Sequence, residues 1–336
     1  MNVLLLTFGY DDDAVLERKL ARGRANLHMF RRGQTAPAGL CARADGIVHY
    51  SAVEAMQAPP ASFPRARIVV RSGVGFDNVD LAAWGRRGVP VCNVPDYGTS
   101  EVADHALALM LSLARGTATY QEAVRADPSA GWKFAAAPAV RRLRGAVFGV
   151  VGLGRIGLAA ALRARAFGME VAFHDPYLPS GAEIAVGMRR MKTLASLMAI
   201  ADVLSVHAPL SAETHGLIGT KSLARAKPGM IVINTARGPI VDLAALHRAL
   251  KSGRIAGAGL DVLAREPADA DEPLIAAWRR RESWLEGRLV ISPHAAFYSP
   301  ASIQDLRTKS LTTVLDCLAD GPAANCVNAA QLRKPR

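Results

Sequence analysis

Gly152-Leu-Gly154-Arg-Ile-Gly157 is the stretch that decides the fold of this chain, because of the segments on either side of it. The apolar run Ala146–Val151 comes directly before it and predicts a strand, and Leu158–Phe167 continues it with a helical pattern. In such a unit the first glycine permits a tight turn, the second lets the backbone approach a pyrophosphate, and the third lets helix and strand pack closely. Alone, the pattern is weak, since its odds of arising by chance are on the order of 0.2. Its context predicts a dinucleotide-binding unit.

The residues after this unit indicate which dinucleotide binds. A pyrophosphate would accept hydrogen bonds from the backbone at the start of the helix, at Arg155 and Ile156. The next expected strand, Glu170–His174, ends at Asp175, which stands about 20 residues after the glycines, as such a motif requires. A carboxylate there accepts hydrogen bonds from the adenosine ribose and repels a 2′-phosphate, so it predicts NAD rather than NADP. The alternative is a glycine turn followed by an unrelated capping aspartate.

Apolar runs alternate with helical patterns along almost the whole chain, in two series. The first series of expected strands is Asn2–Thr7, Asn26–Phe30, Gly46–Tyr50, Arg67–Arg71 and Val89–Asn93. The second is Ala146–Val151, Glu170–His174, Val203–His207, Met230–Asn234, Ala256–Val262 and Leu289–Ser292. Strands separated by helices imply crossover connections and parallel sheets. The sequence therefore predicts an α/β protein with two doubly wound domains.

Two helical segments and one irregular tract complete this organisation. Apolar residues recur at helical spacing from Ser100 to about Arg115, and a second amphipathic helix is expected from Pro300 to about Leu318. The tract from Asp127 to Arg144 is rich in Ala, Pro and Arg and predicts a loop or arm. If the terminal helix folds back onto the first domain, that domain is discontinuous.

Composition and length narrow the class of protein. A chain of 336 residues, half apolar and about a fifth charged, suits two globular domains. Its four cysteines form no C-x-x-C pair, which predicts buried or idle thiols in a reducing compartment rather than a disulfide framework or a zinc site. The opening MNVLLLTFGYDDD lacks the basic start and long apolar core of a signal peptide, and no run reaches membrane-spanning length. We expect a cytoplasmic protein.

The net charge of +12 is spread along the chain instead of forming basic blocks with interleaved aromatics. A nucleic-acid surface would show such blocks, so direct binding to nucleic acid is disfavoured. Attraction of an anionic small molecule toward a cleft explains the same charge more simply.

Three stretches in the second half carry residues suited to one reaction. They are Asn234-Thr-Ala-Arg237-Gly, Asp261-Val-Leu-Ala-Arg-Glu266-Pro and Pro293-His294-Ala-Ala-Phe-Tyr-Ser, each at the carboxyl end of an expected strand, where open α/β sheets bind ligands. Arg237 can grip a carboxylate with two parallel hydrogen bonds. His294 can exchange a proton with a carbonyl oxygen, and Glu266 on its other nitrogen would fix the tautomer and stabilise the imidazolium. The set predicts hydride and proton transfer on a 2-hydroxy or 2-oxo acid.

The order of the motifs resembles that of one family. RSGVGFDNVD (Arg71–Asp80), GLGRIG, HDPY (His174–Tyr177), HAPL (His207–Leu210), NTARG, LDV and the EP dipeptide follow one another as they do in the D-isomer-specific 2-hydroxyacid dehydrogenases. The likeness runs from about Arg67 to Ser302. PHAAFYS is similar to the version found in the C-terminal-binding-protein branch of that family.

This resemblance implies a role for each matching residue. Arg237, Glu266 and His294 match the catalytic triad, and Arg71, Val74 and Gly75 match the loop that faces the substrate carboxylate and the nicotinamide. The positions that would line the cofactor are Val74, Gly152, Gly154, Arg155, Ile156, Gly157, Asp175, His207, Ala208, Pro209, Thr214, Thr235, Ala236, Arg237, Asp261, His294 and Ala296. Asp261 would lie near the nicotinamide carboxamide.

The resemblance also implies an architecture and a set of partners. A Rossmann nucleotide-binding domain, residues 99–299, would be inserted in a flavodoxin-like substrate domain made of residues 1–98 and 300–336. The cofactor would be NAD, the substrate a small anionic 2-oxo or 2-hydroxy acid, and the assembly a homodimer formed largely through the nucleotide domain. No metal and no membrane is expected to take part.

Two departures and three alternatives accompany this interpretation. Phe297 stands where the branch usually has tryptophan, and the extra tract Trp278–Trp284 either covers the site or lies on the surface. Phe297 and Tyr50 would form an apolar wall, which predicts uncharged, medium-sized 2-oxo acids as substrates. A non-catalytic NADH-sensing scaffold or corepressor is the main alternative. Formate or phosphite oxidation is disfavoured by Glu266, because formate enzymes have glutamine there. Phosphoglycerate oxidation stays open, although the chain ends without the regulatory domain that many such enzymes carry.

Overall fold

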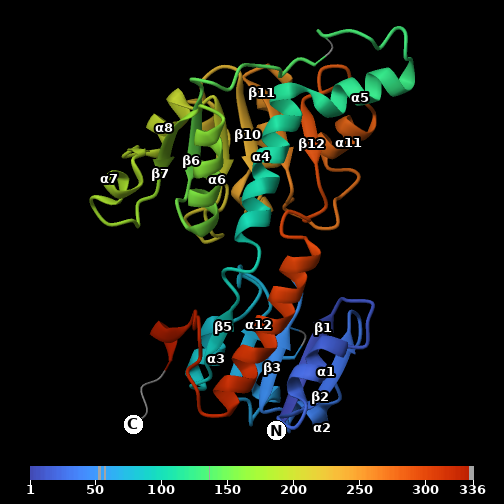
Figure 1. The fold of residues 1–336 in the computed structure, drawn as a ribbon, viewed down its shortest axis with the longest axis vertical. Coiled ribbons are helices and arrows are strands. Elements are labelled where there is room, and N and C mark those ends of the chain that lie inside the picture. The colour runs from blue at the N-terminus through green and yellow to red at the C-terminus, as the bar shows by residue number, and fades with distance from the viewer. Residues whose placement is uncertain (52–53, 57, 136, 333–336) are drawn as a thin grey trace. The chain divides into compact units, whose positions relative to one another are not determined.

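The computed structural model describes residues 1–51, 54–56, 58–135 and 137–332 (Figure 1). The chain divides into two compact units. Unit 1 combines Met1–Gly98 with Ser299–Arg336, and unit 2 is Thr99–Tyr298. Each unit is built around one sheet whose strands are all parallel.

Unit 1 contains a five-stranded sheet in the order β2-β1-β3-β4-β5, the flavodoxin-like strand order. Its strands are β1 (Asn2–Phe8), β2 (Asn26–Arg31), β3 (Gly46–His49), β4 (Ile68–Arg71) and β5 (Val91–Asn93). Its helices are α1 (Val15–Ala21), α2 (Ala38–Cys41), η1 (Pro60–Ser62), α3 (Leu81–Arg86), α12 (Pro300–Leu318) and η3 (Ala329–Gln331). Strands β1, β3, β4 and β5 are buried almost throughout, as parallel strands covered on both faces must be, whereas the edge strand β2 is only partly buried.

The C-terminal helix α12 belongs to the unit formed by the N-terminal residues. Ser299 begins it with a capping box, accepting a hydrogen bond from the Ser302 N–H, and Pro300 occupies the first turn, where no donor is needed. The helix packs against β3 and β4, and a Cβ atom on Gly46 would lie 2.5 Å from Val314. Glycine at this position of β3 therefore allows the close approach of the helix.

Unit 2 contains a seven-stranded sheet in the order β12-β11-β10-β9-β6-β7-β8. Its strands are β6 (Val147–Val151), β7 (Glu170–His174), β8 (Arg189–Arg190), β9 (Val203–Val206), β10 (Met230–Asn234), β11 (Ile255–Leu260) and β12 (Leu289–Ile291). Its helices are α4 (Thr99–Arg115), α5 (Thr117–Ala126), α6 (Arg155–Ala166), α7 (Ala182–Val186), α8 (Leu194–Ile200), α9 (Thr220–Leu223), η2 (Gly238–Ile240), α10 (Leu243–Lys251) and α11 (Pro273–Arg279). Side chains on the two faces of the sheet join two separate cores, one with α4 and α6 and the other with α8, α10 and α11.

The structure confirms the predicted fold class of two parallel-sheet α/β domains. Every predicted strand is present, with bounds that differ by at most two residues at either end. Two elements were missed, the short strand β8 and the helix α5. Over the described residues of the tract 127–144 there is no helix or strand, as expected for a loop or arm. Within the described part of the chain, no helix is both long and apolar enough to cross a membrane.

Candidate active site

The glycine motif forms a strand–turn–helix unit at the carboxyl end of β6. Gly152 has φ of +86°, a left-handed conformation that a side chain would strain. A Cβ atom on Gly157 would lie 2.1 Å from the Gly152 carbonyl oxygen, so the third glycine is needed for the helix to pack. A Cβ atom on Gly154, the residue before α6, would meet no atom within 4 Å. The backbone at Gly154 is therefore open to a ligand.

Asp175 follows β7 and turns its carboxylate toward the glycine loop. Oδ2 accepts a hydrogen bond from the Leu153 N–H at 3.0 Å, and Oδ1 accepts one from the Tyr177 N–H at 2.9 Å. The carboxylate thus fixes the loop between Gly152 and Gly154. Each oxygen keeps a second lone pair that a ribose hydroxyl could use.

Two polar atoms beside the glycine motif lack partners in the described structure. His207 follows β9, and its Nε2 lies 2.8 Å from the Ser205 hydroxyl, while its solvent-shielded Nδ1 makes no hydrogen bond there. Burial lowers the pKa of His207 to about 4, so the ring is neutral at physiological pH. The hydroxyl of Thr235, after β10, is likewise buried and without a partner among the described residues. Unsatisfied polar atoms of this kind fit a site built to hold a polar ligand.

The loop after β9 brings the HAPL motif to the same sheet edge. Thr214 Oγ1 donates a hydrogen bond to the Pro209 carbonyl at 2.6 Å and so closes this loop. The Ala208 backbone lies about 3 Å from where a Cβ on Gly152 would be, which packs the loop against the glycine turn. Together with the open backbone at Gly154, these residues fit a dinucleotide.

His294 and Glu266 form a close pair in unit 2. His294 Nδ1 lies 2.6 Å from Glu266 Oε2, and Glu266 Oε1 accepts a hydrogen bond from the Leu263 N–H at 2.9 Å. Burial alone would raise the pKa of Glu266, but the hydrogen bond and charge of His294, the Leu263 N–H and the charge of Arg237 hold it below its ordinary value. Glu266 is therefore a carboxylate at neutral pH, and the shared bond sets the orientation of the ring.

The loop that carries His294 is held by Asp261, a residue only 2% exposed. Asp261 Oδ1 accepts hydrogen bonds from Ser292 Oγ at 2.6 Å and from the Ala295 N–H at 2.9 Å, and Oδ2 accepts one from the Ala296 N–H at 3.0 Å. His294 itself has φ of +53° and donates its N–H to the Asp261 carbonyl at 2.7 Å. A left-handed histidine costs about 1–3 kcal/mol and persists only where its surroundings impose it, which is common in active sites.

Arg237 lies in a loop that Asn234 shapes. The buried Asn234 side chain accepts a hydrogen bond from the Ala236 N–H at 3.0 Å and donates one to the Arg237 carbonyl at 2.9 Å. A Cβ atom on Gly238 would lie 1.9 Å from the Leu263 carbonyl carbon, so glycine lets this loop approach the loop of Glu266. The positive charge of Arg237 is one of the causes that keep the pKa of Glu266 below its ordinary value.

In unit 1 the predicted substrate loop follows β4. The Arg71 side chain, 3% exposed, folds back so that Nη1 donates to the Ser72 carbonyl at 3.0 Å. A Cβ atom on Gly73 would lie 1.5 Å from that nitrogen, so only glycine fits beside the guanidinium. Asn93 Nδ2 donates to the Val74 carbonyl at 2.6 Å and anchors the loop to the end of β5.

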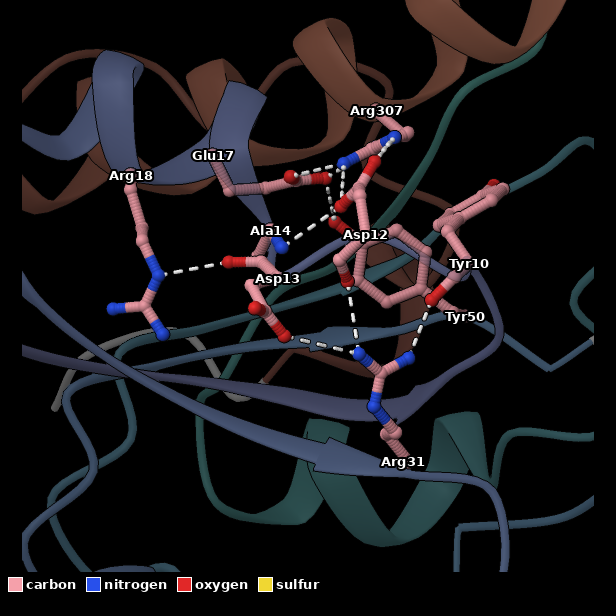
Figure 2. Close-up of polar contacts among 9 residues, drawn as sticks. All are labelled: Tyr10, Asp12, Asp13, Ala14, Glu17, Arg18, Arg31, Tyr50 and Arg307. Atoms are coloured by element: carbon pink, nitrogen blue, oxygen red, sulfur yellow. Dashed lines mark hydrogen bonds and ion pairs between the residues drawn. The ribbon is translucent and has the colours of Figure 1, made fainter.

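A cluster of charges and aromatic rings lies at the carboxyl end of β1 (Figure 2). Arg307, on α12, makes paired hydrogen bonds of 2.6–2.9 Å with both Asp12 and Glu17 and lies over the rings of Phe8 and Tyr10. The Tyr50 hydroxyl donates to Glu17 at 3.1 Å. Tyr50 was predicted to form part of an apolar wall around the substrate. Because its hydroxyl is bonded to Glu17, only its aromatic ring is available for that role.

With this geometry described, the chain can be compared with known proteins. Residues 107–296 match the D-isomer specific 2-hydroxyacid dehydrogenase family, NAD binding domain. The chain belongs to this family. The prediction of the family is thereby confirmed, and the matched residues are its NAD-binding domain.

One relative and two solved structures show what the members can do. The D-3-phosphoglycerate dehydrogenase of Mycobacterium leprae is 40% identical over 262 residues, which are 78% of this chain and 47% of that protein. The chain thus spans about half the length of this relative. Aquifex aeolicus D-lactate dehydrogenase, solved with NAD and lactic acid, has a TM-score of 0.82 and 25% identity over 98% of this chain and 99% of its own. An NADPH-dependent glyoxylate/hydroxypyruvate reductase of Sinorhizobium meliloti, solved with NADP and malonate, has a TM-score of 0.83 and 30% identity over 100% and 99%.

In this D-2-hydroxyacid dehydrogenase family member, unit 2 brings together Arg237, Glu266 and His294 and carries all the residues expected to line the cofactor except Val74, which belongs to unit 1. The extra tract Trp278–Trp284 packs away from this edge within unit 2. Trp284 stacks on His247 of α10 with ring centroids 5.3 Å apart, and Lys251 Nζ lies 5.9 Å from the centroid of the Trp284 ring. Of the two possibilities raised for the tract, this geometry favours a surface position.

Sequence reasoning missed the Arg307 cluster and the positioning role of His105. His105 Nε2 lies 2.8 Å from Ser292 Oγ, which is itself bonded to Asp261. Glu17 and Arg307 stand 290 residues apart, and each lies in a helix that also carries exposed charges. The sequence signal that could have indicated this cluster is an ionisable residue, Glu17 or Arg307, on the apolar face of each helix.

Proposed function

We propose that this chain is an NAD-dependent D-2-hydroxyacid dehydrogenase that interconverts a 2-oxo acid and the corresponding 2-hydroxy acid. The observation that carries the proposal is the 2.6 Å contact between Glu266 and His294 Nδ1. His294 Nε2 makes no hydrogen bond in the described part of the chain, so it has a nitrogen to offer to a substrate oxygen. A scaffold that only senses NADH has no use for such a pair.

Each residue of the set has a distinct task in the proposed reaction. When bound, the nicotinamide supplies or accepts the hydride. His294 Nε2 donates a proton to the ketone oxygen in reduction and takes it from the hydroxyl in oxidation. Glu266 holds the ring in position through Nδ1, and Arg237 binds the carboxylate of the acid. Arg71, Val74 and Gly75 are proposed to bind the same carboxylate group, as the family resemblance implies.

The proposed cofactor contacts follow the sheet edge of unit 2. The N–H groups of Arg155 and Ile156, at the start of α6, are proposed to bind the pyrophosphate. His207 Nδ1 and the Thr235 hydroxyl, both buried and unpartnered in the described structure, are proposed to gain hydrogen bonds when the dinucleotide binds. Asp175 is proposed to bind the ribose and to favour NAD over NADP. Asp261 is proposed to lie near the nicotinamide carboxamide. The other positions proposed to line the cofactor are Gly152, Gly154, Gly157, Val74, Ala208, Pro209, Thr214, Ala236, Arg237, His294 and Ala296.

The proposed substrates are uncharged, medium-sized 2-oxo acids. Phe297 makes an edge-to-face contact with the His294 ring at 6.2 Å, and Tyr50 has its hydroxyl engaged by Glu17. Neither ring brings a charge that would bind a phosphate or a second carboxylate. Each buried methylene adds up to ~0.8 kcal/mol, so side chains of two to four carbons are expected to raise kcat/KM by roughly ten- to a hundredfold.

A panel of acids tests the reaction and the substrate class together. NADH consumption is followed with glyoxylate, pyruvate, 2-oxoisocaproate, phenylpyruvate and phosphohydroxypyruvate, for the unmodified protein and for Phe297→Ala. We expect the branched and aromatic acids to have the highest kcat/KM and the variant to lose that preference. Preference for glyoxylate or for the phosphorylated acid by an order of magnitude would contradict the apolar wall. NADH binding without turnover on any acid would favour the scaffold alternative.

The motif PHAAFYS suggests that the chain belongs to the C-terminal-binding-protein branch of the family. The proposed assembly is a homodimer. Trp132 and Phe134, on the arm of unit 2, are 79% and 95% exposed, which is unusual for large apolar side chains. A second copy of the chain is proposed to cover them. Sedimentation or light scattering should give a dimer, and Trp132→Ser with Phe134→Ser should shift it toward monomer. If the unmodified protein is monomeric at micromolar concentration, the proposed homodimer is contradicted.

A further inference from the structure

Two cysteines that are far apart in sequence lie opposite each other in unit 1. The tail segment around Cys326 runs antiparallel to β5 and forms a bridge in which Cys92 faces Cys326. The Val327 N–H donates to the Val91 carbonyl at 2.8 Å, and the Asn93 N–H donates to the Asn325 carbonyl at 3.3 Å. Both hydrogen bonds flank the two cysteines, so Cys92 and Cys326 form a non-hydrogen-bonded pair. The Cα atoms in such a pair are about 4.5 Å apart, and disulfides span Cα separations of roughly 4.4–6.8 Å.

The tail is fixed on the far side of Cys326 by Asn328, which is fully buried. Asn328 Oδ1 accepts a hydrogen bond from the Val91 N–H at 2.8 Å, and Nδ2 donates to the Val89 carbonyl at 3.1 Å. Further along, Gln331 packs so tightly on α3 that a Cβ atom on Gly85 would lie 2.6 Å from it. The backbones of Cys92 and Cys326 are therefore held in register, at the spacing that a disulfide spans.

The two thiols differ in how they meet an oxidant. Cys92 is fully buried, and burial together with the neighbouring thiols of Cys326 and Cys317 raises its pKa to about 12. Cys326 is partly exposed, and its thiol donates to Asn328 Oδ1 at 3.3 Å. A reagent from solution therefore reaches Cys326 first, and Cys92 can react only with a sulfur already bonded at Cys326.

We propose that Cys92 and Cys326 form a reversible disulfide, a covalent modification site whose oxidant is a low-molecular-weight disulfide. The Cys326 thiolate attacks one sulfur of the reagent, a mixed disulfide forms, and the first reagent thiolate leaves. The sulfur of Cys92, losing its proton to that thiolate, then attacks the Cys326 sulfur and expels the second reagent thiolate, which takes up the proton that Cys326 released on ionising. Two protein thiols are oxidised, and one reagent disulfide is reduced to two thiols.

The bond would fasten the tail to the strand that supports the substrate loop. Asn93 is next to Cys92, and its Nδ2 donates a hydrogen bond to the Val74 carbonyl at 2.6 Å. The Val94 N–H donates to the Gly73 carbonyl at 3.0 Å. Because a cross-link restricts the unfolded chain, the oxidised protein is expected to have a higher Tm than the reduced protein. This effect depends on the fold of unit 1 and not on the proposed catalytic activity.

The test equilibrates the full chain in buffers of increasing oxidised over reduced glutathione, with trapping of free thiols before denaturation. The four thiols should fall to two, peptide mapping should join Cys92 to Cys326, and dithiothreitol should restore all four. Cys326→Ser should abolish both the cross-link and the rise in Tm. The matched control Cys41→Ser, a buried thiol on α2, should leave both intact.

Three results would overturn the proposal. They are four free thiols at the most oxidising ratio, a cross-link that maps to Cys317 and Cys326, and bonds that form only between molecules. If Cys326→Ser fails to fold, Cys92→Ala gives the same readout, because it removes the second sulfur while leaving Cys326 to stop at the mixed disulfide with glutathione.

Discussion

Two acid–base clusters, one in each unit, differ in what they leave free: Arg307 and Glu17 are buried, whereas His294 and Glu266 are partly exposed. In unit 1, Arg307 binds two carboxylates with four short hydrogen bonds and lies over two aromatic rings. The hydrogen bonds with Glu17 and Asp12 outweigh the effect of burial and raise the pKa of Arg307. The guanidinium therefore stays charged at every pH at which the protein is folded. In unit 2, Glu266 binds only one nitrogen of His294. The other nitrogen makes no hydrogen bond within the described residues.

The comparison teaches how to separate a supporting cluster from a reactive one. Arginine cannot give up its proton, and in unit 1 its donors are consumed by Asp12, Glu17 and the rings, so the cluster can position a loop but cannot transfer a proton. The imidazole of histidine can both give and accept a proton, and the pair in unit 2 leaves Nε2 of His294 without a hydrogen bond among the described residues. The first cluster should therefore govern stability, and the second should govern turnover.

The largest effect is expected from Arg307→Met, which leaves Glu17 buried without its partner. Removing one member of a buried ion pair costs about 3–5 kcal/mol, so the free energy of unfolding should fall by that amount. Urea unfolding followed by circular dichroism measures it. The matched control is Arg24→Met, whose ion pair with Asp316 is exposed and should cost roughly 1 kcal/mol or less. Equal losses in the two variants would mean that the Arg307 cluster is not a supporting element.

The second largest effect is expected at the His294–Glu266 pair of unit 2, and it is an effect on turnover. His294→Ala should lower kcat at least about a hundredfold, equivalent to roughly 2.7 kcal/mol, because it removes the proposed general acid. NADH affinity and unfolding free energy should change little. His28→Ala, on β2 of unit 1, is the control and should keep its turnover. Near-normal kcat in His294→Ala would remove the residue from the mechanism.

Acid should destabilise unit 2 through His207 before it protonates most carboxylates. The pKa of this buried ring is about 4 in the folded protein, against 6.5 for an ordinary histidine. The unfolded chain therefore binds a proton first, and stability present above pH 6.5 is lost as the pH falls toward 4. Between pH 6.5 and 5 the loss should be about 1.6 kcal/mol. His207→Gln should remove this part of the pH dependence, and an unchanged dependence would show that the ring is not responsible.

The smallest of these effects concerns the nucleotide. Asp175→Ala removes a negative charge beside the proposed ribose site and should narrow the preference for NADH over NADPH by roughly tenfold, or about 1.4 kcal/mol. The measurement is kcat/KM for both cofactors in both proteins. Comparable values for NADH and NADPH in the unmodified protein would contradict the assignment of Asp175.

The sequence allowed the sheets to be predicted because their strands are short, nearly continuous apolar runs such as Met230–Asn234. It did not reveal β8, whose two residues are both arginine, or α5, whose residues are mostly polar and exposed. The pattern of the glycine motif was likewise sufficient to place the turn before α6.

Contacts between distant residues were harder to foresee. The cluster around Arg307 and the pairing of Cys92 with Cys326 join positions more than 200 residues apart, and no local pattern marks them. The absence of C-x-x-C spacing among the four cysteines predicted buried or idle thiols. In the structure, the tail segment around Cys326 runs beside β5 and brings Cys326 opposite Cys92. The pairing of His294 with Glu266 was predicted from the chemistry of residues that end two expected strands, and the order of the motifs supported it.

The central claim is hydride transfer to the α-carbon, and isotope transfer tests it most directly. The protein is incubated with NADH carrying deuterium at C4 of the nicotinamide and with 2-oxoisocaproate, and the product is analysed by mass spectrometry and chiral chromatography. With the deuterium on the face that the enzyme uses, the account predicts label at C2 of a D-2-hydroxy acid. Label retained on the nicotinamide for both C4 epimers, or no product while the labelled cofactor remains bound, would contradict it.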